Sequence, residues 1–291
     1  MNFINHISPI QKLNFRGFEF YVKRDDLLGE INGNKARKLA FYLRQKYPKN
    51  QCFVSYGGSQ SNALGALSIF IRQRSYKLVF VCEKIPDFLK LNPCGNYALA
   101  LHNGVKLVEN PGFLPLRQFA LSLCKKGDVF IEQGIANFQA QEGYKELAEE
   151  IQRQSEDLKL KFDIFLPSGT GTSAAFLAKY SQFKVFTCAC VGDIKHLKQQ
   201  ILTLMQDYDF SNLEFLKSSK KYHFAKPYKE FYNLYKDLKQ ELGIEFDLLY
   251  DVLGLSLVLE KQWENPLLYI HQGGILGNVS MLQRYDFKKM L

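Results

Sequence analysis

Short apolar runs alternate with helix-forming segments along nearly the whole chain, and this alternation limits the possible folds most strongly. The runs are rich in Val, Ile, Phe and Tyr, and the segments between them carry apolar residues at a helical period. Such a chain is predicted to be an α/β protein with mostly parallel sheets covered on both faces. The expected strands lie near 18–23, 51–56, 77–82, 105–109, 128–132, 163–167, 183–190 and 266–271. The expected helices lie near 34–47, 60–73, 94–103, 115–125, 140–154, 172–180, 194–206, 228–241, 252–262 and 276–284.

The chain has 291 residues, which is long for one simple core, so two lobes that share a cleft are expected. No repeat, low-complexity tract or linker rich in Pro, Gly and Ser separates two halves. A second lobe must therefore be an insertion that leaves the first lobe and returns to it. Segment 207–227 is polar, lysine-rich and weakly periodic, which indicates either a long ordered loop near a site or a mobile lid.

The composition limits the kinds of partner. Hydrophobic residues make up 46% of the chain and charged residues 23%, so most of the chain is expected to fold. The net charge is +9, but Lys and Arg are scattered along the sequence and form no basic stripe with interleaved aromatic residues. A nucleic-acid groove is therefore not expected. A positive cleft would still attract anionic ligands such as a phosphate or a carboxylate.

The cysteines, the histidines and the apolar runs point away from disulfide, metal and membrane proteins. None of the six cysteines forms a C-x-x-C pair, and several lie in apolar runs, so buried thiols are expected. The five histidines have no metal-ligand spacing. The N-terminus MNFINHISPI lacks a signal-peptide pattern, and the most apolar stretch, LLYDVLGLSLVL, is too short to span a bilayer. A cytoplasmic location is expected.

One lysine stands at an unusual position. The segment YVKRDDLLGEINGNKARKL places Lys35 in the first turn of an expected helix. Free amides and the helix dipole put partial positive charge at this end of a helix. That field would lower the pKa of the amine, and a neutral lysine is the nucleophile that forms an imine with a carbonyl group. Taken alone, an exposed helix lysine beside Arg37 and Lys38 is the simpler explanation.

A glycine-rich segment, YGGSQSN at residues 56–62, follows an expected strand and opens an expected helix. Its glycines let the backbone approach a ligand, while Ser59, Ser61 and Asn62 offer hydroxyl and amide groups beside the free helix amides. This arrangement suits a carboxylate or a phenolate oxygen. An ordinary helix cap after a glycine turn is the alternative.

A second such segment, PSGTGTSAAFLA, combines Gly169 and Gly171 with nearby hydroxyl groups at the start of a helix. This combination favours a bound phosphate over a purely structural turn. The string from Gly169 to Ala174 also fits the dinucleotide pattern G-x-G-x-x-A, and Asp193 follows at the usual distance of ~20 residues. A nicotinamide cofactor therefore stays open at this point.

Two further segments follow expected strands near the C-terminus. LLYDVLG carries Tyr250 and Asp251, and IHQGGILGN begins with Ile270 and His271. A histidine that closes an apolar strand is most simply a hydrogen-bonded structural residue. Open parallel sheets bind ligands at the carboxyl ends of their strands, so the polar groups at these junctions together indicate one cleft.

Taken in order, these segments resemble the 1-aminocyclopropane-1-carboxylate deaminase and D-cysteine desulfhydrase family of pyridoxal-phosphate enzymes. KRDDLLGEINGNKARKL resembles K-R-[DE]-D-x5-GGNK-x-RKL, GGSQSN resembles GG-I-QSN, and LYIHQGG resembles IHTGG. The segments FIEQGIANFQAQEGY, PSGTGTS and LLYDVLG match three further motifs, and the resemblance spans residues 19–284. It implies a tryptophan synthase β-like fold with two lobes, each a mostly parallel twisted sheet flanked by helices. Residues 1–48 and 138–291 would form the large cofactor-binding domain, and 49–137 the small one.

The resemblance implies pyridoxal 5'-phosphate as the cofactor and Lys35 as the lysine that carries it as a Schiff base. Tyr250 and Ser61 are implied to assist the chemistry. The other residues implied to contact the cofactor are Asn62 at its phenolate oxygen, Gly169, Thr170, Gly171 and Thr172 at its phosphate, and Asp251 and Gln272 near its ring. The residues implied to contact the substrate are Gln60, Ser61 and Tyr222.

The chain departs from the family pattern mainly near the substrate. Relatives read YHFGGYAK where this chain reads YHFAK at 222–226, so three residues including an active-site tyrosine are missing, and Gln272 replaces a threonine. The implied activity is that of a homodimeric lyase or deaminase that releases a 2-oxo acid and ammonia from a small amino acid, with D-cysteine or a related D-amino acid slightly favoured. A homologue that binds the cofactor without turnover is one alternative. A nicotinamide-dependent oxidoreductase is a weaker one.

Overall fold

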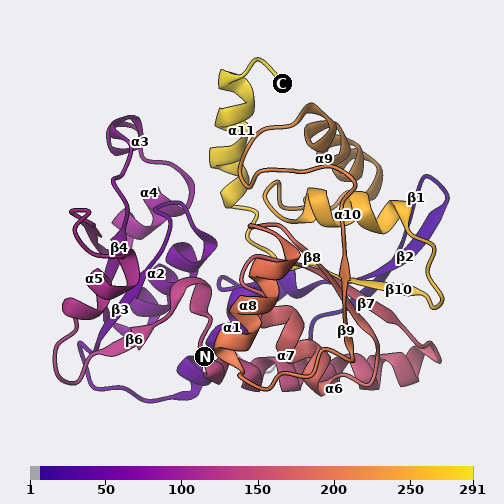
Figure 1. Cartoon of the computed structure of the whole chain (residues 1–291), viewed down its shortest axis with the longest axis horizontal. Coiled ribbons are helices and arrows are strands. Elements are labelled where there is room, and N and C mark those ends of the chain that lie inside the picture. The colour runs from indigo at the N-terminus through magenta and orange to yellow at the C-terminus, as the bar shows by residue number, and fades with distance from the viewer. Residues whose placement is uncertain (1–6, 291) are drawn as a thin grey trace.

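The computed structural model describes residues 7–290 and contains two sheets that lie side by side (Figure 1). The larger sheet has the strand order β1-β2-β10-β7-β8-β9, and all neighbouring strands are parallel except β1 and β2. The smaller sheet has the order β5-β4-β3-β6 and is entirely parallel. The predicted two-lobed α/β fold with mostly parallel sheets is confirmed.

The strands of the larger sheet are β1 Ile10–Phe15, β2 Phe18–Lys23, β7 Asp163–Ser168, β8 Val185–Ala189, β9 Leu213–Leu216 and β10 Leu267–Ile270. Those of the smaller sheet are β3 Cys52–Tyr56, β4 Lys77–Cys82, β5 Lys106–Glu109 and β6 Val129–Ile131. The smaller sheet is therefore an insertion between strands of the larger one, as predicted. The exact domain boundaries at 48/49 and 137/138 stay a prediction.

Every predicted helix is present. The α-helices are α1 Gly33–Arg44, α2 Asn62–Arg74, α3 Asp87–Leu91, α4 Gly95–His102, α5 Leu116–Ser122, α6 Gln141–Leu158, α7 Thr172–Tyr180, α8 Ile194–Leu204, α9 Lys229–Leu242, α10 Asp251–Glu260 and α11 Gly277–Phe287. Short 3₁₀ turns occupy Asp25–Leu27, Gln133–Ile135 and Phe138–Ala140. The five-residue α3 was not predicted.

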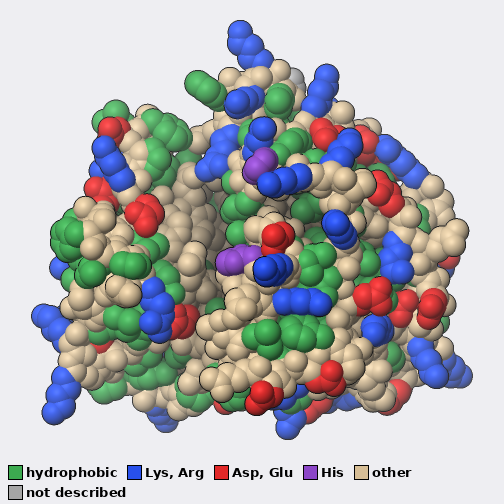
Figure 2. Space-filling view, in the orientation of Figure 1, with side chains coloured by type: hydrophobic (Ala, Val, Ile, Leu, Met, Phe, Trp, Pro, Cys, Tyr) green, Lys and Arg blue, Asp and Glu red, His purple; other side chains and the backbone are tan. Residues whose placement is uncertain are grey.

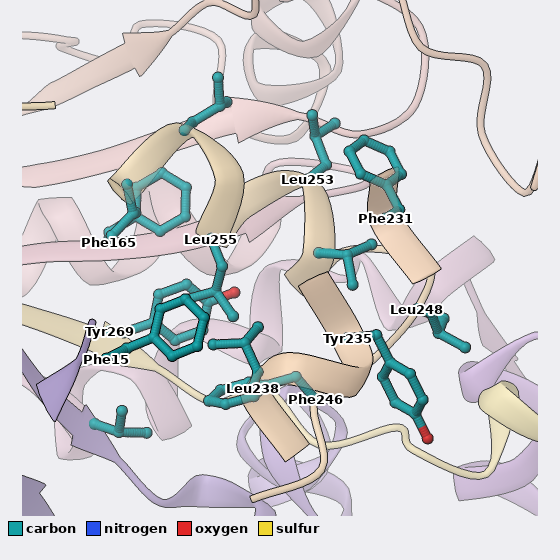
Figure 3. Packing of buried hydrophobic residues seen from close by; sticks show 14 of the residues in the cluster. Phe15, Phe165, Phe231, Tyr235, Leu238, Phe246, Leu248, Leu253, Leu255 and Tyr269 are labelled. Atoms are coloured by element: carbon teal, nitrogen blue, oxygen red, sulfur yellow. The ribbon is translucent and has the colours of Figure 1, made fainter. Parts of the chain in front are cut away.

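Two hydrophobic clusters cover the two faces of the larger sheet. On one face, Phe165 and Tyr269 of the sheet pack with Phe231 and Leu238 of α9 and with Leu255 of α10 (Figure 3). On the other face, the buried side chains come from α6, α7 and α8. The smaller sheet is covered by α2 and α4 on one face and by α5 on the other. Parallel strands buried in this way explain the nearly continuous apolar runs of the sequence.

Helix α1 joins the two halves of the molecule. Leu39, Tyr42 and Leu43 belong to the core of the smaller sheet, while the opposite side of α1 packs closely on α6. A Cβ on Gly143 of α6 would overlap the backbone oxygen of Arg37, so a glycine is needed for the two helices to approach this closely. The first turn of α1 is thereby held between the two sheets.

Within residues 7–290, no helix is both long enough and apolar enough to cross a membrane. All six cysteines are free thiols. The expectation that they are buried is correct for Cys82, Cys188 and Cys190, whereas the other three are only half-buried.

Candidate active site

A cavity of about 510 Å³ lies between the two sheets, at the carboxyl ends of their strands. Figure 2 shows the hollow between the part of the molecule that carries the smaller sheet and the remainder. The predicted site residues among its lining are Lys35, Gln60, Ser61, Asn62, Gly169, Thr170, Gly171, Tyr250, Asp251 and Gln272. A more open hollow of about 630 Å³ near the C-terminal end of α7 is lined by none of the predicted site residues.

Lys35 lies half-buried in the wall of the cavity. Desolvation lowers the pKa of its amine to about 8, although the Asp247 carboxylate acts in the opposite direction. The turn before it depends on Gly33, whose φ is 56° and whose Cβ position is occupied by the backbone oxygen of Gln272. The backbone N–H of Asn34 donates to that same oxygen at 3.0 Å. These contacts fix the turn that carries Lys35 into the cavity wall.

A buried ion cluster anchors α1 directly behind Lys35. The Arg37 guanidinium donates to both oxygens of Asp25 at 2.8 and 2.9 Å and to both oxygens of Glu150 at 2.7 and 2.8 Å. The fully buried Lys23 ammonium lies 3.0 Å from Glu150. Because each buried charge has an opposite charge beside it, the cluster avoids the cost of an isolated buried ion. It ties α1 to β2 and α6.

Lys38 was not predicted as a site residue, yet it lines the cavity one helical turn after Lys35. Its side chain is 3% exposed, and its amine donates to the backbone oxygen of Gly134 at 3.1 Å. Burial and, to a lesser degree, the Lys35 ammonium hold the pKa of Lys38 well below its usual value. Its three-residue spacing from Lys35 on one helix is the signal that could have revealed it.

The glycine-rich loop before α7 forms another wall. Gly171 has a φ of 73°, and a Cβ there would lie 2.6 Å from Ile201, so this position requires glycine. Thr172 opens α7, but its buried hydroxyl lies 3.0 Å from that of Thr170 and is not part of the lining. Asp193, the acidic residue of the dinucleotide pattern, caps α8 by accepting from the backbone N–H of His196 at 2.7 Å.

The segment between β3 and α2 forms the opposite wall. Ser61 caps α2, because its hydroxyl oxygen accepts from the Leu64 N–H at 3.2 Å. The side-chain oxygen of Asn62 accepts from the Asn96 amide at 2.7 Å, which leaves the Asn62 amide nitrogen as a donor. Asn96 is buried and also donates to the Gln60 backbone oxygen at 3.2 Å. Its role in orienting Asn62 was missed because it comes from a different helix.

The segment that leads into α10 supplies two predicted residues with different surroundings. The Tyr250 ring lines the cavity, where burial and the Asp247 carboxylate raise the pKa of its hydroxyl. Asp251 accepts from the Tyr269 hydroxyl at 2.6 Å and from the backbone N–H of Asp247 at 2.9 Å. Burial raises the Asp251 pKa. Gln272 donates to the Pro167 backbone oxygen at 2.6 Å. The side chains of Asp251 and Gln272 are therefore already engaged with protein groups.

Asp247 is a further cavity residue that was not predicted. One of its carboxyl oxygens accepts from the backbone N–H groups of Leu249 and Tyr250 at 2.8 and 2.6 Å. Its other oxygen, Oδ2, has no hydrogen-bond partner among the described residues. Burial and the neighbouring Asp251 raise the pKa of Asp247 to about 8. An aspartate four residues before a helix start is a common turn former, so its sequence signal is weak.

The structure does not bring Tyr222 into the cavity lining. Its ring packs on Tyr228 and Phe231, with ring centroids 4.9 and 4.4 Å away, and its hydroxyl lies 3.4 Å from Glu230. Phe224, two residues later, lines the cavity instead, with its ring centroid 5.2 Å from that of Tyr250. Segment 222–226 thus presents an aromatic ring without a hydroxyl to the cavity.

His271 is a structural residue, as expected. It is completely buried, its Nε2 lies 2.9 Å from the Glu245 backbone oxygen, and its Nδ1 accepts from the Gly273 N–H at 3.2 Å. Among residues 7–290, no group of three or more His, Cys, Asp or Glu side chains is placed to hold a metal ion.

No protein-family model matches the chain, and no curated protein matches it in sequence. Solved structures do resemble it. An ACC deaminase homologue is 22% identical and aligns over 100% of this chain and 95% of its own, with a TM-score of 0.79.

Two further structures resemble the chain over most of its length. A hydrogen sulfide-producing enzyme from Fusobacterium nucleatum is 17% identical, with a TM-score of 0.65 over 94% of this chain and 98% of its own. A fungal L-serine ammonia-lyase from Rhizomucor miehei is 12% identical, with a TM-score of 0.67 over 98% of both chains. The chain therefore has the fold of these proteins, the tryptophan synthase β-like fold that its sequence predicted.

Proposed function

We propose that this protein is a pyridoxal-phosphate-dependent lyase or deaminase that acts on a small amino acid and releases a 2-oxo acid and ammonia. The observation that carries the proposal is the amine of Lys35, which lines a cleft and has a pKa lowered to about 8. A lysine of this kind is a nucleophile toward an aldehyde. The three similar structures include an ACC deaminase homologue, a hydrogen sulfide-producing enzyme and a serine ammonia-lyase, and their names support the reaction class.

The lining of the cavity fits pyridoxal phosphate. Gly169, Thr170 and Gly171 line the cavity at the start of α7, where free amides favour a phosphate. The buried amine of Lys38, which donates to the Gly134 backbone oxygen at 3.1 Å, would offer the phosphate a further N–H donor. Asn62 would donate its amide to the phenolate oxygen, and Lys35 would bind the aldehyde carbon covalently. The cofactor supplies an electron-withdrawing ring that stabilises negative charge on the substrate carbon.

The remaining lining would handle the substrate. The hydroxyl and amide groups of Gln60 and Ser61 lie beside the start of α2, which suits the carboxylate of an amino acid. The freed amine of Lys35 would move a proton at the substrate carbon, and Tyr250 faces the same space. A small D-amino acid such as D-cysteine is the substrate we favour slightly, and a cytoplasmic homodimer is the form in which we expect the protein.

A second candidate is a homologue that binds the cofactor but has little turnover. It is favoured by one observation, the exclusion of Tyr222 from the cavity lining and the presence of Phe224 there. Phenylalanine cannot donate or accept a proton, so a step that needs a hydroxyl at this place would be lost. Asp193 caps α8 and is not part of the cavity lining, which argues against the nicotinamide alternative.

Purified protein incubated with pyridoxal phosphate tests the first step of the proposal. A yellow, protein-bound absorbance is expected, and borohydride reduction followed by peptide mapping is expected to label Lys35. Lys35→Ala should abolish the label, whereas Lys46→Ala, a change at an exposed lysine, should keep it. A protein that stays colourless after the cofactor is added would contradict the proposal.

Release of pyruvate or 2-oxobutanoate from a panel of D- and L-amino acids, with the cyclopropane amino acid included, tests the second step. Turnover of at least one small amino acid is expected. Full cofactor occupancy without turnover on any of them would instead support the binding homologue.

A further inference from the structure

The lining of the cavity has one charged side chain that is exposed. This is Arg284 of α11, the only exposed charged residue among the lining residues that the structure describes. The other charged residues of the lining are buried or half-buried, namely Lys35, Lys38, Asp247 and Asp251. Arg284 therefore marks the mouth of the cavity, where a ligand enters from solvent.

The Arg284 guanidinium lacks a charged partner. Arg37 and Arg117, by contrast, each pair with a carboxylate, with shortest N–O distances of 2.7 and 2.6 Å. Within residues 7–290, no acidic side chain lies within 4.0 Å of the Arg284 guanidinium. An arginine without such a partner at a cavity mouth can bind an anionic ligand, and its planar fork suits the two oxygens of a carboxylate.

Two hydrogen bonds hold the guanidinium in place. Its Nη1 donates to the backbone oxygen of Ala225 at 2.8 Å, and its Nη2 donates to the side-chain oxygen of Gln60 at 3.3 Å. Both acceptors also line the cavity, Ala225 from the segment before α9 and Gln60 from the segment before α2. Neither acceptor is charged, and a guanidinium carries more N–H donors than these bonds use. The remaining donors are available to an anion inside the mouth.

The cations near the mouth support Arg284 but do not replace it. Lys226 follows Ala225 in the sequence and is exposed, but it is not part of the lining, and its ammonium lies 5.5 Å from the centre of the Tyr228 ring. Figure 2 shows further Lys and Arg side chains around the upper end of the hollow. Their charges would raise the concentration of anions at the mouth, whereas Arg284 offers the direct contact.

The proposed function leaves Arg284 without an anion. It assigns the phosphate of the cofactor to the loop before α7, and the α-carboxylate of the substrate to Ser61 and the start of α2. The buried wall of the cavity offers Asp247 and Asp251, which are 2% and 1% exposed and provide no cation to a further anionic group. A second anionic group of the substrate is therefore expected to lie at the mouth.

We propose that Arg284 determines specificity for an amino acid whose side chain ends in an anionic group, for example a cysteine whose sulfur carries a short acid. The α-carboxylate would bind at the start of α2, and the anionic end of the side chain would accept from the free guanidinium donors at the mouth. Arg284 contributes recognition only, so no bond forms or breaks at this residue. The inference rests on the proposed function for its reaction and narrows the substrate to this class.

Turnover of two matched amino acids tests the proposal. S-carboxymethylcysteine and S-carbamoylmethylcysteine, each as both enantiomers, differ only in a terminal carboxylate or carboxamide. Elimination breaks the bond between the β-carbon and sulfur, consumes water and releases pyruvate, ammonia and a thiol from either. The wild type is expected to show about tenfold higher kcat/KM for the carboxylate, mainly through a lower KM.

Variants of α11 assign this preference to one residue. Arg284→Gln should abolish the preference, whereas Arg284→Lys should keep part of it, because an ammonium retains the charge without the planar fork. Lys288→Gln removes an exposed positive charge just after α11. This control should keep the full preference.

A second measurement needs no turnover. Phenylglyoxal modifies exposed arginines, and peptide mass spectrometry measures the rate at each one. S-carboxymethylcysteine is expected to slow the modification of Arg284 several-fold, because a bound carboxylate covers the guanidinium. S-carbamoylmethylcysteine should leave the rate unchanged. Arg153, exposed on α6, is the control within the same sample and should react equally in both cases.

The outcomes separate the two proposals. Equal kcat/KM for the two amino acids in the wild type, or a preference that persists in Arg284→Gln, would overturn the role of Arg284. Equal protection by both amino acids would also overturn it, since Arg284 would then bind the α-carboxylate that they share. A protein without any turnover would refute the proposed function, and the selective protection of Arg284, or its absence, would still decide whether the anion site exists.

Discussion

Lys38 shows how a single residue can serve the site at the expense of stability. Its amine is buried, has one hydrogen bond to a backbone oxygen, and lies near the Lys35 ammonium, so the folded state binds its proton less well than the unfolded chain does. Stability therefore rises with pH between the lowered folded pKa and the unfolded value of 10.5. The protein carries this penalty near neutral pH, where a phosphate at the glycine-rich loop would relieve it.

We predict that Lys38→Met stabilises the unliganded protein by about 1–2 kcal/mol near pH 7, since an apolar side chain replaces a poorly paired buried amine. The gain in stability should shrink as the pH rises toward 10.5, the pKa of the lysine amine in the unfolded chain. Urea unfolding near pH 7 and at about pH 10 measures both the gain and its decrease.

The same variant should bind pyridoxal phosphate about tenfold more weakly, because a charge-assisted hydrogen bond is lost. Unchanged affinity, with Lys46→Met as the control, would show that Lys38 does not contact the phosphate.

The site residues that the sequence predicted are those that follow strands in recognisable local patterns. Lys35, Asn62 and Gly169 belong to this group, because each lies in a turn at the start of a helix and such turns meet at one edge of parallel sheets. Asn96 and Asp247 could not be predicted in this way. The importance of Asn96 comes from its contact with Asn62, which is far away in the sequence. The burial of Asp247 in the cavity wall follows from tertiary packing that its local sequence does not encode.

At the scale of elements, the two strands that the sequence did not predict are the two edges of the larger sheet. β1 and β9 each have a neighbour on one side only. The burial of β1 alternates irregularly, and β9 has four residues. Edge strands face solvent and carry polar residues, so they lack the apolar runs of the inner strands. For this reason β9 was not predicted, and segment 207–227, which contains it, was predicted as a loop or lid. The rest of this segment is irregular.

The close approach of α1 and α6 gives a prediction about how the site is held. A methyl group at Gly143 would overlap the Arg37 backbone oxygen and lie 3.0 Å from the Ala40 Cβ. We expect Gly143→Ala to lower the free energy of unfolding by about 1–3 kcal/mol, because neither helix backbone can yield easily. Glu149→Ala, at an exposed position of α6, should change it little. Urea denaturation measures both variants, and equal stabilities would mean that the helices can separate without cost.

At the scale of the whole molecule, the alternating pattern predicts two sheets and one inserted lobe, but it does not predict how the lobes meet. That arrangement depends on contacts such as those of α1 with both cores. It also depends on the mouth of the cavity, where Arg284 of α11 donates to the Ala225 backbone oxygen at 2.8 Å and to the Gln60 side-chain oxygen at 3.3 Å. These three residues come from three separate segments that line the cavity.

Arg284 is therefore expected to restrict the opening of the mouth. Each hydrogen bond at such a place contributes about 0.5–1.5 kcal/mol, so the loss of both in Arg284→Ala should raise hydrogen exchange in residues 57–62 and 217–228 several-fold. Arg284→Lys should restore only part of the protection, because an ammonium group lacks the planar fork that reaches two acceptors. Lys288→Ala, just after α11, is the control. Exchange that is unchanged in Arg284→Ala would mean that packing around Phe224, not this arginine, keeps the mouth closed.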